Sequence, residues 1–334
     1  MMNTSIPVFL SSDDNYAPFV AVTIASICYN TKSFIDFYIL DGSISESNKN
    51  QIEMLKERFK NLNIEFLTID SEKVWADCYK GYSCSLAKYN VWLIPYLKPN
   101  LDKVIYLDAD VIALGDILEL YQEDLGGYVL GAVYDIGYIN KMHLALYKNK
   151  VDLIDSHKCF NAGVLLIDCK RWLDNKTTRK LLKIESKYRE CKQNEDQSIL
   201  NKCFENNYKA LDLKYNCFAY YKNYDDYIME YFGINKGFIC NASQECVIRH
   251  FTGGYTSRPW QYNYSIDPTS ISLYPLPNFA DFWVYAKMTA FYDQLHEKYN
   301  KNQTQYRGKL LACLSQYKKL DREEIQKMVT IRVE

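Results

Sequence analysis

The stretch KVIYLDADVIALGDI, residues 103–117, decides how this sequence is interpreted. Its apolar run from Val104 to Leu107 is typical of a buried strand. Asp108 and Asp110 follow at once, with a single alanine between them, and apolar residues then resume. Two carboxylates at the end of a core strand need an explanation, because neighbouring like charges repel each other unless a cation joins them.

Around this stretch, the first half of the chain alternates between strand and helix patterns. Strands are predicted at 6–12, 35–42, 64–70 and 103–107, and helices at 16–30, 45–59 and 85–97. Ser45 is the expected N-cap of the amphipathic helix at 45–59. This alternation is typical of an α/β protein with a mostly parallel sheet and helices on both faces.

The second half of the chain has a less regular pattern. It predicts strands at 128–135, 160–169 and 247–251, helices near 170–190 and 196–206, a loop over 255–280 and a helical tail from about 281. From Lys298 to the end, nine Lys or Arg residues stand against four Asp or Glu. We therefore expect one domain over 1–280 and a basic helical extension over 281–334.

The composition argues against several classes of protein. The chain has 334 residues and a formal net charge of -1, so its overall charge does not indicate a nucleic-acid partner. The 11 cysteines are scattered without a CxxC pair, which is typical of reduced, mostly buried thiols in a cytoplasmic protein. The N-terminus lacks a signal-peptide pattern, and no apolar run reaches the ~18 residues that indicate a membrane span.

We interpret the acid pair as half of a metal site. Residues i and i+2 of an extended segment point to the same side, so Asp108 and Asp110 should face the same space. Mg²⁺ and Mn²⁺ prefer oxygen ligands and accept substrate phosphates in their remaining positions. The alternative is that the acids cap a helix beginning near GDILELY, as acids after strands often do.

Further polar residues follow two other predicted strands. The acids and the amide of SSDDNY, residues 11–16, either cap the next helix or bind the polar edge of a base or ribose. His250 ends the strand VIRH, where a lone histidine is more often structural than functional. Gly253 and the glycine after it would let the backbone approach a ligand closely, and Arg258 offers a fixed positive charge for phosphate.

Five motifs, taken in order, resemble family 8 of the retaining glycosyltransferases, which includes bacterial lipopolysaccharide galactosyl- and glucosyltransferases and glycogenin. They are FLSSDDNYAPFVAVTIASI, KVIYLDADVIALGDI, FNAGVLLIDCKRW, NEDQSILN and HFTGGYTSRPW. The resemblance implies a GT-A fold, in which a Rossmann-like nucleotide-binding sheet carries an acceptor-binding part. It also implies a UDP-sugar donor, a saccharide acceptor and Mn²⁺ or Mg²⁺.

The resemblance also implies roles for individual residues. The family's metal ligands match Asp108, Asp110 and His250. The residues around the uridine match Asp13, Asn15 and Tyr16. The residues facing the donor sugar match Asn161, Ala162, Asp196 and Gln197. The diphosphate-binding loop matches Gly253 and Arg258, further cofactor-binding positions match Asp108 and Ala109, and an acid near the acceptor matches Asp135.

Two positions depart from the family pattern. Arg258 stands where the loop usually has Lys before Pro-Trp, which keeps the charge but changes its geometry. Val91 stands where many members carry a donor-binding Arg, and Lys88, one helical turn earlier, is the expected replacement. These departures leave the identity of the donor sugar open.

The reaction expected from the resemblance is front-face attack by the acceptor hydroxyl. Retention in glycosidases usually needs a carboxylate nucleophile, but the family pattern places the amide of Gln197 near the anomeric carbon. An amide is a poor nucleophile, so Gln197 is expected to stabilise positive charge through its carbonyl oxygen. Asp196 is expected to hold a sugar hydroxyl.

Other interpretations stay open from the sequence alone. Phosphatases of the haloacid dehalogenase type also place DxD after a strand, but usually near the N-terminus and with Thr or Val where this chain has Ile112. A non-catalytic nucleotide-sugar-binding protein and a self-glycosylating enzyme are further alternatives. We expect a cytoplasmic protein. The basic tail either packs on the domain or contacts an anionic membrane, and the second alternative would add peripheral contact with the inner face of the cell membrane.

Overall fold

The computed structural model describes residues 5–80, 86–135, 159–189, 196–218, 244–252, 258–260, 264–267, 272–275 and 279–302. Its first half contains β1 (Ile6–Ser12), α1 (Ala17–Asn30), β2 (Ile35–Asp41), α2 (Glu46–Glu53), α3 (Leu55–Arg58), β3 (Leu62–Thr68), α4 (Ser71–Val74), the 3₁₀-helix η1 (Leu86–Leu93), α5 (Ile94–Leu97), β4 (Lys103–Leu107), β5 (Val111–Ala113), α6 (Leu118–Gln122) and β6 (Leu130–Tyr134). Its second half contains β7 (Phe160–Asp168), α8 (Cys169–Asp174), α9 (Thr177–Tyr188), α10 (Asp196–Phe204), β8 (Lys209–Ala210), the 3₁₀-helix η4 (Leu213–Tyr215), β9 (Cys217–Phe218), β10 (Ile248–His250), β11 (Tyr264–Asp267), β12 (Ser272–Pro275) and α13 (Phe279–Ala286). A last helix covers 292–302.

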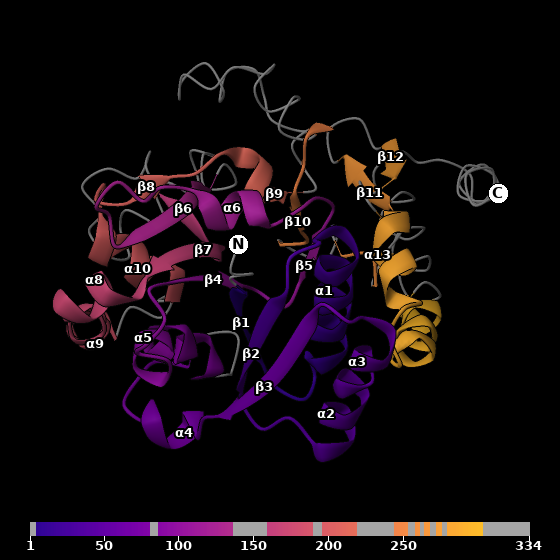
Figure 1. Ribbon diagram of the computed structural model, residues 1–334, viewed down its shortest axis with the longest axis horizontal. Coiled ribbons are helices and arrows are strands. Elements are labelled where there is room, and N and C mark those ends of the chain that lie inside the picture. Colours follow the sequence, from indigo (N-terminus) through magenta and orange to yellow (C-terminus); the bar gives the residue numbers. More distant parts are fainter. Residues whose placement is uncertain are drawn as a thin grey trace, which may run out of the picture.

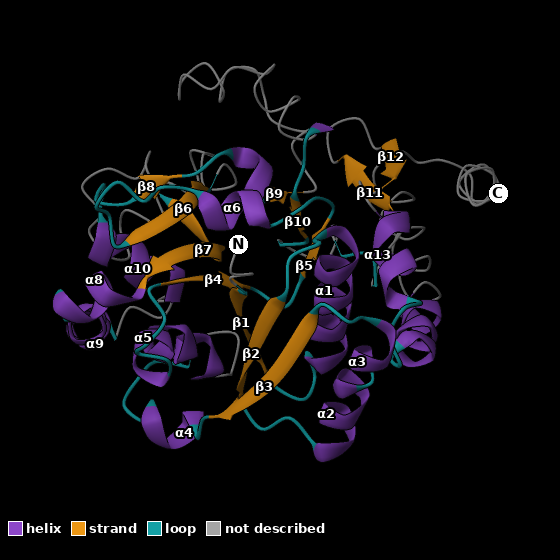
Figure 2. Cartoon of the chain, in the orientation of Figure 1, coloured by secondary structure: helices purple, strands orange, loops and turns teal. Residues whose placement is uncertain are grey.

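The central sheet of the described residues has seven strands in the order β3-β2-β1-β4-β7-β6-β8. Strands β1 to β4 pair in parallel with one another, and β7 runs antiparallel to both β4 and β6 (Figure 1). The predicted mostly parallel sheet is therefore confirmed. A second sheet of three short strands, β5-β10-β9, lies beside it (Figure 2).

The two faces of the central sheet carry separate hydrophobic cores. Ile105 and Leu107 of β4 point into one core with α1, whereas Val104 and Tyr106 point into the other with η1 and α8 to α10. This is the period-two alternation of a strand buried on both faces. Helices α1, α2 and α3 accordingly lie on one side of the sheet, and α4, α5, α8, α9 and α10 on the other (Figure 1).

The structure corrects several predicted elements. The single helix expected at 45–59 is divided at Met54 into α2 and α3. Residues 85–97 are not one α-helix, because Pro95 lacks an N–H and fits only the first turn of an α-helix, so α5 begins there after the 3₁₀ turns of η1. The helix expected at 170–190 is divided where Lys176 adopts a left-handed φ of 53°.

Part of the segment predicted as loop forms a hairpin. Strands β11 and β12 pair antiparallel, from Tyr264 opposite Pro275 to Asp267 opposite Ser272. Pro275, at the end of β12, is at a position where a missing N–H is tolerated. The loop prediction for 255–280 is therefore wrong for these two strands.

The beginning of the predicted helical tail packs on the main domain. Helix α13 lies along α1 (Figure 1), and the Asn30 side chain donates a hydrogen bond of 2.9 Å to the hydroxyl of Tyr285. Most of the basic extension, residues 303–334, lies outside the described residues. Within the described ranges, none of the helices combines the length and apolar character needed to cross a bilayer.

The cysteines that the structure describes agree with the predicted reduced state. Cys28, Cys159, Cys169 and Cys217 are buried among these residues, and none of the four is in a disulfide. Burial raises the pKa of Cys28 and of Cys169 to about 12, so both side chains remain protonated near neutral pH.

Helix α1 is otherwise apolar, but Thr23, Ser26 and Asn30 form a polar seam along it. This seam fixes the backbone that follows Asp108. The Thr23 hydroxyl donates to the carbonyl oxygens of Ala109 and Val111, at 3.1 and 2.8 Å. One and two turns later, Ser26 accepts from the Ala113 N–H, and Asn30 donates to the Ala113 carbonyl oxygen. These residues recur at i, i+3 and i+7, so they form one stripe on the helix.

The opposite edge of the same segment is paired with the second sheet. Phe251 N–H donates to the carbonyl of Asp110, and Leu114 N–H donates to the carbonyl of Val247. Alternate backbone groups of a strand point to opposite edges, so residues 109–113 are held from both sides, by α1 and by β10. This places Asp110 on a rigid backbone.

We predict that Thr23→Val destabilises the protein by about 1–3 kcal/mol, because two buried carbonyl oxygens lose a donor while the side-chain volume is kept. Urea unfolding would measure the loss. The control is Thr68→Val at an exposed position, where we expect a change within about 0.5 kcal/mol. Equal stability of Thr23→Val and the unmodified protein would contradict the seam's role.

Candidate donor and metal site

The sheet brings the polar ends of β1 and β4 to one edge. Leu10 lies opposite Leu107 in parallel register, so the residues that follow the two strands lie at the same edge of the sheet. Beyond β1, the Asp13 carboxylate accepts a hydrogen bond from the Tyr16 N–H. Tyr16 lies near Arg258, Asp110 and Asp108, and desolvation there raises its pKa above the ordinary value. Ligand sites of open α/β sheets form at this edge.

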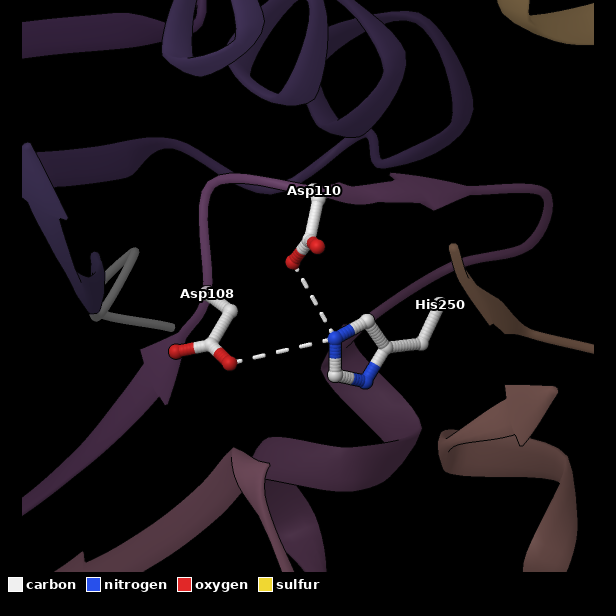
Figure 3. A group of neighbouring side chains, drawn as sticks. All are labelled: Asp108, Asp110 and His250. Carbon is white, nitrogen blue, oxygen red and sulfur yellow. Dashed lines mark hydrogen bonds and ion pairs between the residues drawn. The ribbon is translucent and has the colours of Figure 1, made fainter. Parts of the chain in front are cut away.

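Antiparallel pairing of β5 with β10 brings His250 to the two acids. His250 lies opposite Val111 in this pairing, directly beside Asp110 although 140 residues separate them in sequence. Figure 3 shows both carboxylates pointing at the same ring nitrogen of His250. The three predicted metal ligands therefore come from two sheets and meet at one point.

The geometry of this cluster suits a divalent cation. His250 Nε2 lies 3.1 Å from an oxygen of Asp110 and 3.8 Å from an oxygen of Asp108. The three donor atoms all lie within 4.8 Å of one another. Carboxylate oxygens suit Mn²⁺ and Mg²⁺, and an imidazole nitrogen favours a transition metal, so the donor set fits Mn²⁺ well.

The electrostatics of the cluster also suit a cation. Desolvation raises the pKa of Asp108; His250 opposes this and Asp110 adds to it. Desolvation alone would raise the pKa of Asp110, but His250 and Arg258 outweigh it and lower that pKa. Burial alone would lower the pKa of His250, but Asp110 and Asp108 raise it. The acids thus favour positive charge at this point, which a bound cation would supply.

Polar side chains form hydrogen bonds with two of the proposed metal ligands and orient them. The Tyr106 hydroxyl donates to the Asp108 carboxylate at 2.9 Å. His250 Nδ1 lies 3.0 Å from Oδ1 of Asn216, and Asn216 is fully buried. Partners of this kind fix the orientation of metal ligands in protein sites.

Gly163 provides the space in which His250 lies. A Cβ atom at this position would be 2.2 Å from His250 Cε1 and 2.8 Å from Asp108 Oδ2. Gly163 also accepts the hydrogen bond of the Asp108 N–H, at 2.9 Å, which ties β7 to the metal cluster. The glycine of FNAG is therefore needed for lack of space, not for an unusual backbone angle.

Arg258 reaches the cluster because its neighbour Trp260 is anchored in the core. Trp260 packs between Phe19 of α1 and Phe282 of α13, with ring centroids 4.4 and 5.2 Å away. Arg258 lies 3.6 Å from a carboxylate oxygen of Asp110. Its Nε is buried without a hydrogen-bond partner among the described residues, which would suit a phosphate oxygen.

The residues expected to face the donor sugar form a connected network beside the cluster. Gln197 Oε1 accepts from the Ala162 N–H and from Nδ2 of Asn161, at 3.1 and 3.2 Å. Asp135 accepts from Gln197 Nε2 at 2.9 Å and from Asn161 Nδ2 at 3.2 Å. The structure thus brings together four residues that the sequence placed at the donor and acceptor.

The structure places most of the other predicted site residues individually. Asn15 is exposed, Ala109 is buried between the acids, and Asp196 begins α10 at a partly buried position. Lys88 donates to the carbonyl of Lys80 at 3.1 Å. Gly253 lies outside the described residues. Their proposed roles stay predictions.

Sequence reasoning missed several residues that build the site. Gly163 was within the quoted FNAG motif, but its closeness to His250 depends on β10, which is far along the chain. Asn216 stands in an unremarkable stretch, KYNCF, and Thr23 is inside an apolar helix. No local pattern marks either residue, because their partners are distant in sequence.

The model of glycosyl transferase family 8 matches residues 7–264, and the chain belongs to this family. The galactosyltransferase LgtC, whose structure holds donor and acceptor sugar analogues, superposes with a TM-score of 0.66 at 23% identity, over 85% of this chain and 96% of that one. The likeness shows a shared fold, and the predicted GT-A fold is confirmed.

Two curated relatives show the sequence similarity. A glycosyltransferase of Haemophilus influenzae is 34% identical over 211 residues, which are 63% of this chain and 62% of that protein. The lipopolysaccharide 1,2-glucosyltransferase of Escherichia coli K12 is 30% identical over 204 residues, which are 60% of this chain and 59% of that protein. The matched part spans less than two thirds of either relative, at 62% and 59%.

We predict that Gly163→Ala abolishes Mn²⁺ binding, because the added methyl group displaces His250 or Asp108. Isothermal titration with Mn²⁺ would measure the loss. The control is Gly115→Ala, whose Cβ would meet Val247 only at an ordinary 3.5 Å. Mn²⁺ affinity of Gly163→Ala within twofold of the unmodified protein would contradict the crowding argument.

Proposed function

We propose that this protein transfers a hexose, galactose or glucose, from a UDP-sugar to a saccharide acceptor, with retention at the anomeric carbon and with Mn²⁺ or Mg²⁺ as cofactor. One observation carries the proposal: Asp108, Asp110 and His250 converge at the carboxyl edge of the sheet in a family 8 chain. The adjoining network of Asp135, Asn161 and Gln197 offers polar groups for a sugar.

The proposed product is part of lipopolysaccharide or another surface glycan. Support comes from the relatives' names, a lipopolysaccharide 1,2-glucosyltransferase and a galactosyltransferase. They differ in sugar, so both hexoses are retained in the proposal. The proposal also includes peripheral membrane contact through the basic tail. It includes as well the division of the chain into a catalytic domain and an extension.

Different residues of the protein would bind the cation, the diphosphate and the uridine. Asp108, Asp110 and His250 would hold the cation, which when bound neutralises charge on the leaving diphosphate. Arg258 would add a second positive charge, since its guanidinium already lies 3.6 Å from Asp110. Tyr16, partly exposed at the same edge, would contact the uridine.

In the transfer step, the bond between the anomeric carbon and the phosphate oxygen breaks. The acceptor oxygen forms the new bond on the same face, and its proton passes to the leaving phosphate oxygen. No protein nucleophile is needed on this route. Asp196, at the start of α10, would hold a sugar hydroxyl.

The structure sharpens the proposed role of Gln197. A carbonyl oxygen has two lone pairs, and here the Ala162 N–H and Asn161 Nδ2 engage both. Gln197 would stabilise charge on the sugar only after one of these donors turns away. The N–H of Ala162 is fixed in β7, so the Asn161 side chain would have to turn, and this would also break its bonds with Gly163 and Asn216.

The main test is a panel of nucleotide sugars with Mn²⁺, scored for donor hydrolysis and for transfer to saccharides. We expect activity with UDP-galactose or UDP-glucose, and loss of at least about 10²-fold in Asp110→Asn or in excess chelator, because the cation site is broken. Asp174→Asn, whose carboxylate pairs with Lys170 on the surface, is the control.

The panel also separates the alternatives. Donor binding without hydrolysis or transfer would favour a non-catalytic nucleotide-sugar-binding protein. A mass increase of the protein itself would favour self-glycosylation, and release of phosphate from a phosphomonoester would favour a phosphatase. Full activity of Asp110→Asn in chelator would contradict the metal requirement.

A second prediction tests the route. Gln197→Ala should lower kcat by about 10²–10³-fold, the range seen when a group stabilising transition-state charge is removed, with Mn²⁺ affinity nearly unchanged. Intact mass spectrometry after incubation with donor alone should find no glycosyl adduct. A trapped adduct on Asp196 would show that a protein nucleophile takes part.

A further inference from the structure

We propose that Asn216 is a positioning residue that keeps His250 in the Nδ1–H tautomer, so that the Nε2 lone pair is free for the cation. The inference rests on the metal site in the proposed function. Asn216 is fully buried and lies 3.0 Å from His250 Nδ1, on the side of the ring away from the acids. A cation bound among Asp108, Asp110 and His250 needs Nε2 without a proton.

The polarity of the hydrogen bonds around Asn216 follows from one backbone group. The Gly163 N–H can only donate, and it points at the Asn161 side chain, at 2.9 Å. The Asn161 atom facing it must therefore be the oxygen, Oδ1. The same oxygen lies 2.9 Å from the Asn216 side chain, so the Asn216 atom there must be the nitrogen, Nδ2.

The remaining atom of Asn216 is then an oxygen, and it faces His250. A carbonyl oxygen accepts but cannot donate, so the ring nitrogen beside it must carry the proton. This is Nδ1 of His250. The tautomer follows from a chain of donors and acceptors that starts at the backbone of β7.

A second anchor confirms the same polarity from the other end. The Ala162 N–H donates to Gln197, which fixes that atom as the oxygen Oε1 and turns the Gln197 nitrogen to Asp135. Asp135 also receives Nδ2 of Asn161. An ionised carboxylate only accepts, so it agrees with the Asn161 orientation deduced from Gly163.

Without Asn216, the cluster would favour the wrong tautomer. Asp110 lies 3.1 Å and Asp108 3.8 Å from Nε2, so both carboxylates attract a proton to that nitrogen. An acceptor at Nδ1 is the opposing force that leaves Nε2 available. The acids that bind the cation and the amide that prepares the imidazole therefore act on opposite sides of one ring.

The fold places Asn216 firmly. It lies between η4 and β9, and its own N–H donates to the Leu213 carbonyl at 3.1 Å. Strand β9 pairs in parallel with β10, with Phe218 opposite His250. Asn216 directly precedes β9 and His250 ends β10, so the pairing of these two strands limits the relative movement of the two residues.

The experiment uses the full chain with Asn216→Leu, which keeps the volume but removes both polar atoms. In metal-free protein labelled with ¹⁵N-histidine, the His250 ring should lose the Nδ1–H signature. The chain has four histidines, so the ring signals are few. Mn²⁺ affinity by titration should fall about 10–100-fold, as for other partners of metal-ligating histidines.

Two further variants separate positioning from general stability. Asn90→Leu removes another fully buried amide, one that bonds Ser71 and Trp75 in the opposite core, and should leave the His250 signature and Mn²⁺ affinity unchanged. Asn216→Asp keeps the acceptor at Nδ1 but cannot donate to Asn161. It should retain the Nδ1–H signature and bind Mn²⁺ within about tenfold of the unmodified protein.

The outcomes distinguish this inference from the proposed function. If the unmodified protein binds no Mn²⁺, the metal part of the function fails, and the ring spectra still test the tautomer. The inference is overturned if Asn216→Leu keeps the Nδ1–H signature. It is also overturned if Asn216→Asp loses that signature as Leu does, or if Asn90→Leu weakens Mn²⁺ binding equally.

Discussion

The repulsion between two carboxylates at the end of β4 is the constraint on which the site depends. Asp108 and Asp110 face one small space, where partial burial makes their charges more costly than in water. His250 and Arg258 offset this cost in the cluster, with the imidazole 3.1 Å from Asp110 and the guanidinium 3.6 Å from it. Positive charge is thus required here, and a divalent cation meets the requirement with higher charge than a proton.

Supplying that charge determines features far from the acids. His250 reaches them because β5, the short strand after DAD, pairs with β10. The imidazole fits because position 163 lacks a side chain, and a methyl group there would be 2.2 Å from the ring. Arg258 arrives because Trp260 is fixed between α1 and α13. The strand pairing, the glycine and the anchored tryptophan each allow a positively charged or metal-binding group to reach the two acids.

The sequence predicted the parts of this arrangement that local pattern can encode. The apolar run before Asp108 indicated a core strand, and the parallel order of β1 to β4 followed from the alternation of strand and helix patterns. His250 was found through the ordered motifs, since a lone histidine carries little information by itself. A strand at 247–251 was predicted, but the second sheet was not, because β5 and β9 have only three and two residues and the sheet is fixed by long-range pairing.

Helix boundaries failed for a related reason. Periodicity over 170–190 is helical throughout, yet Lys176 turns left-handed and divides α8 from α9. A left-handed φ at a non-glycine residue carries a local cost that the hydrophobic pattern does not register. Periodicity reports which faces are buried, whereas the ends of helices depend on the backbone between them.

Helix α1 shows how stability and the site are joined. Its buried residues are mostly apolar, as expected for a helix that is covered by other elements. Thr23 and Ser26 are also fully buried. A buried hydroxyl is costly unless it is bonded, and both are satisfied by the backbone of 109–113 or by α1 itself. The core therefore accepts polar atoms where they hold the segment that carries Asp110. If this segment loosened, the carboxylates would separate, and their affinity for a cation would fall before the fold itself was lost.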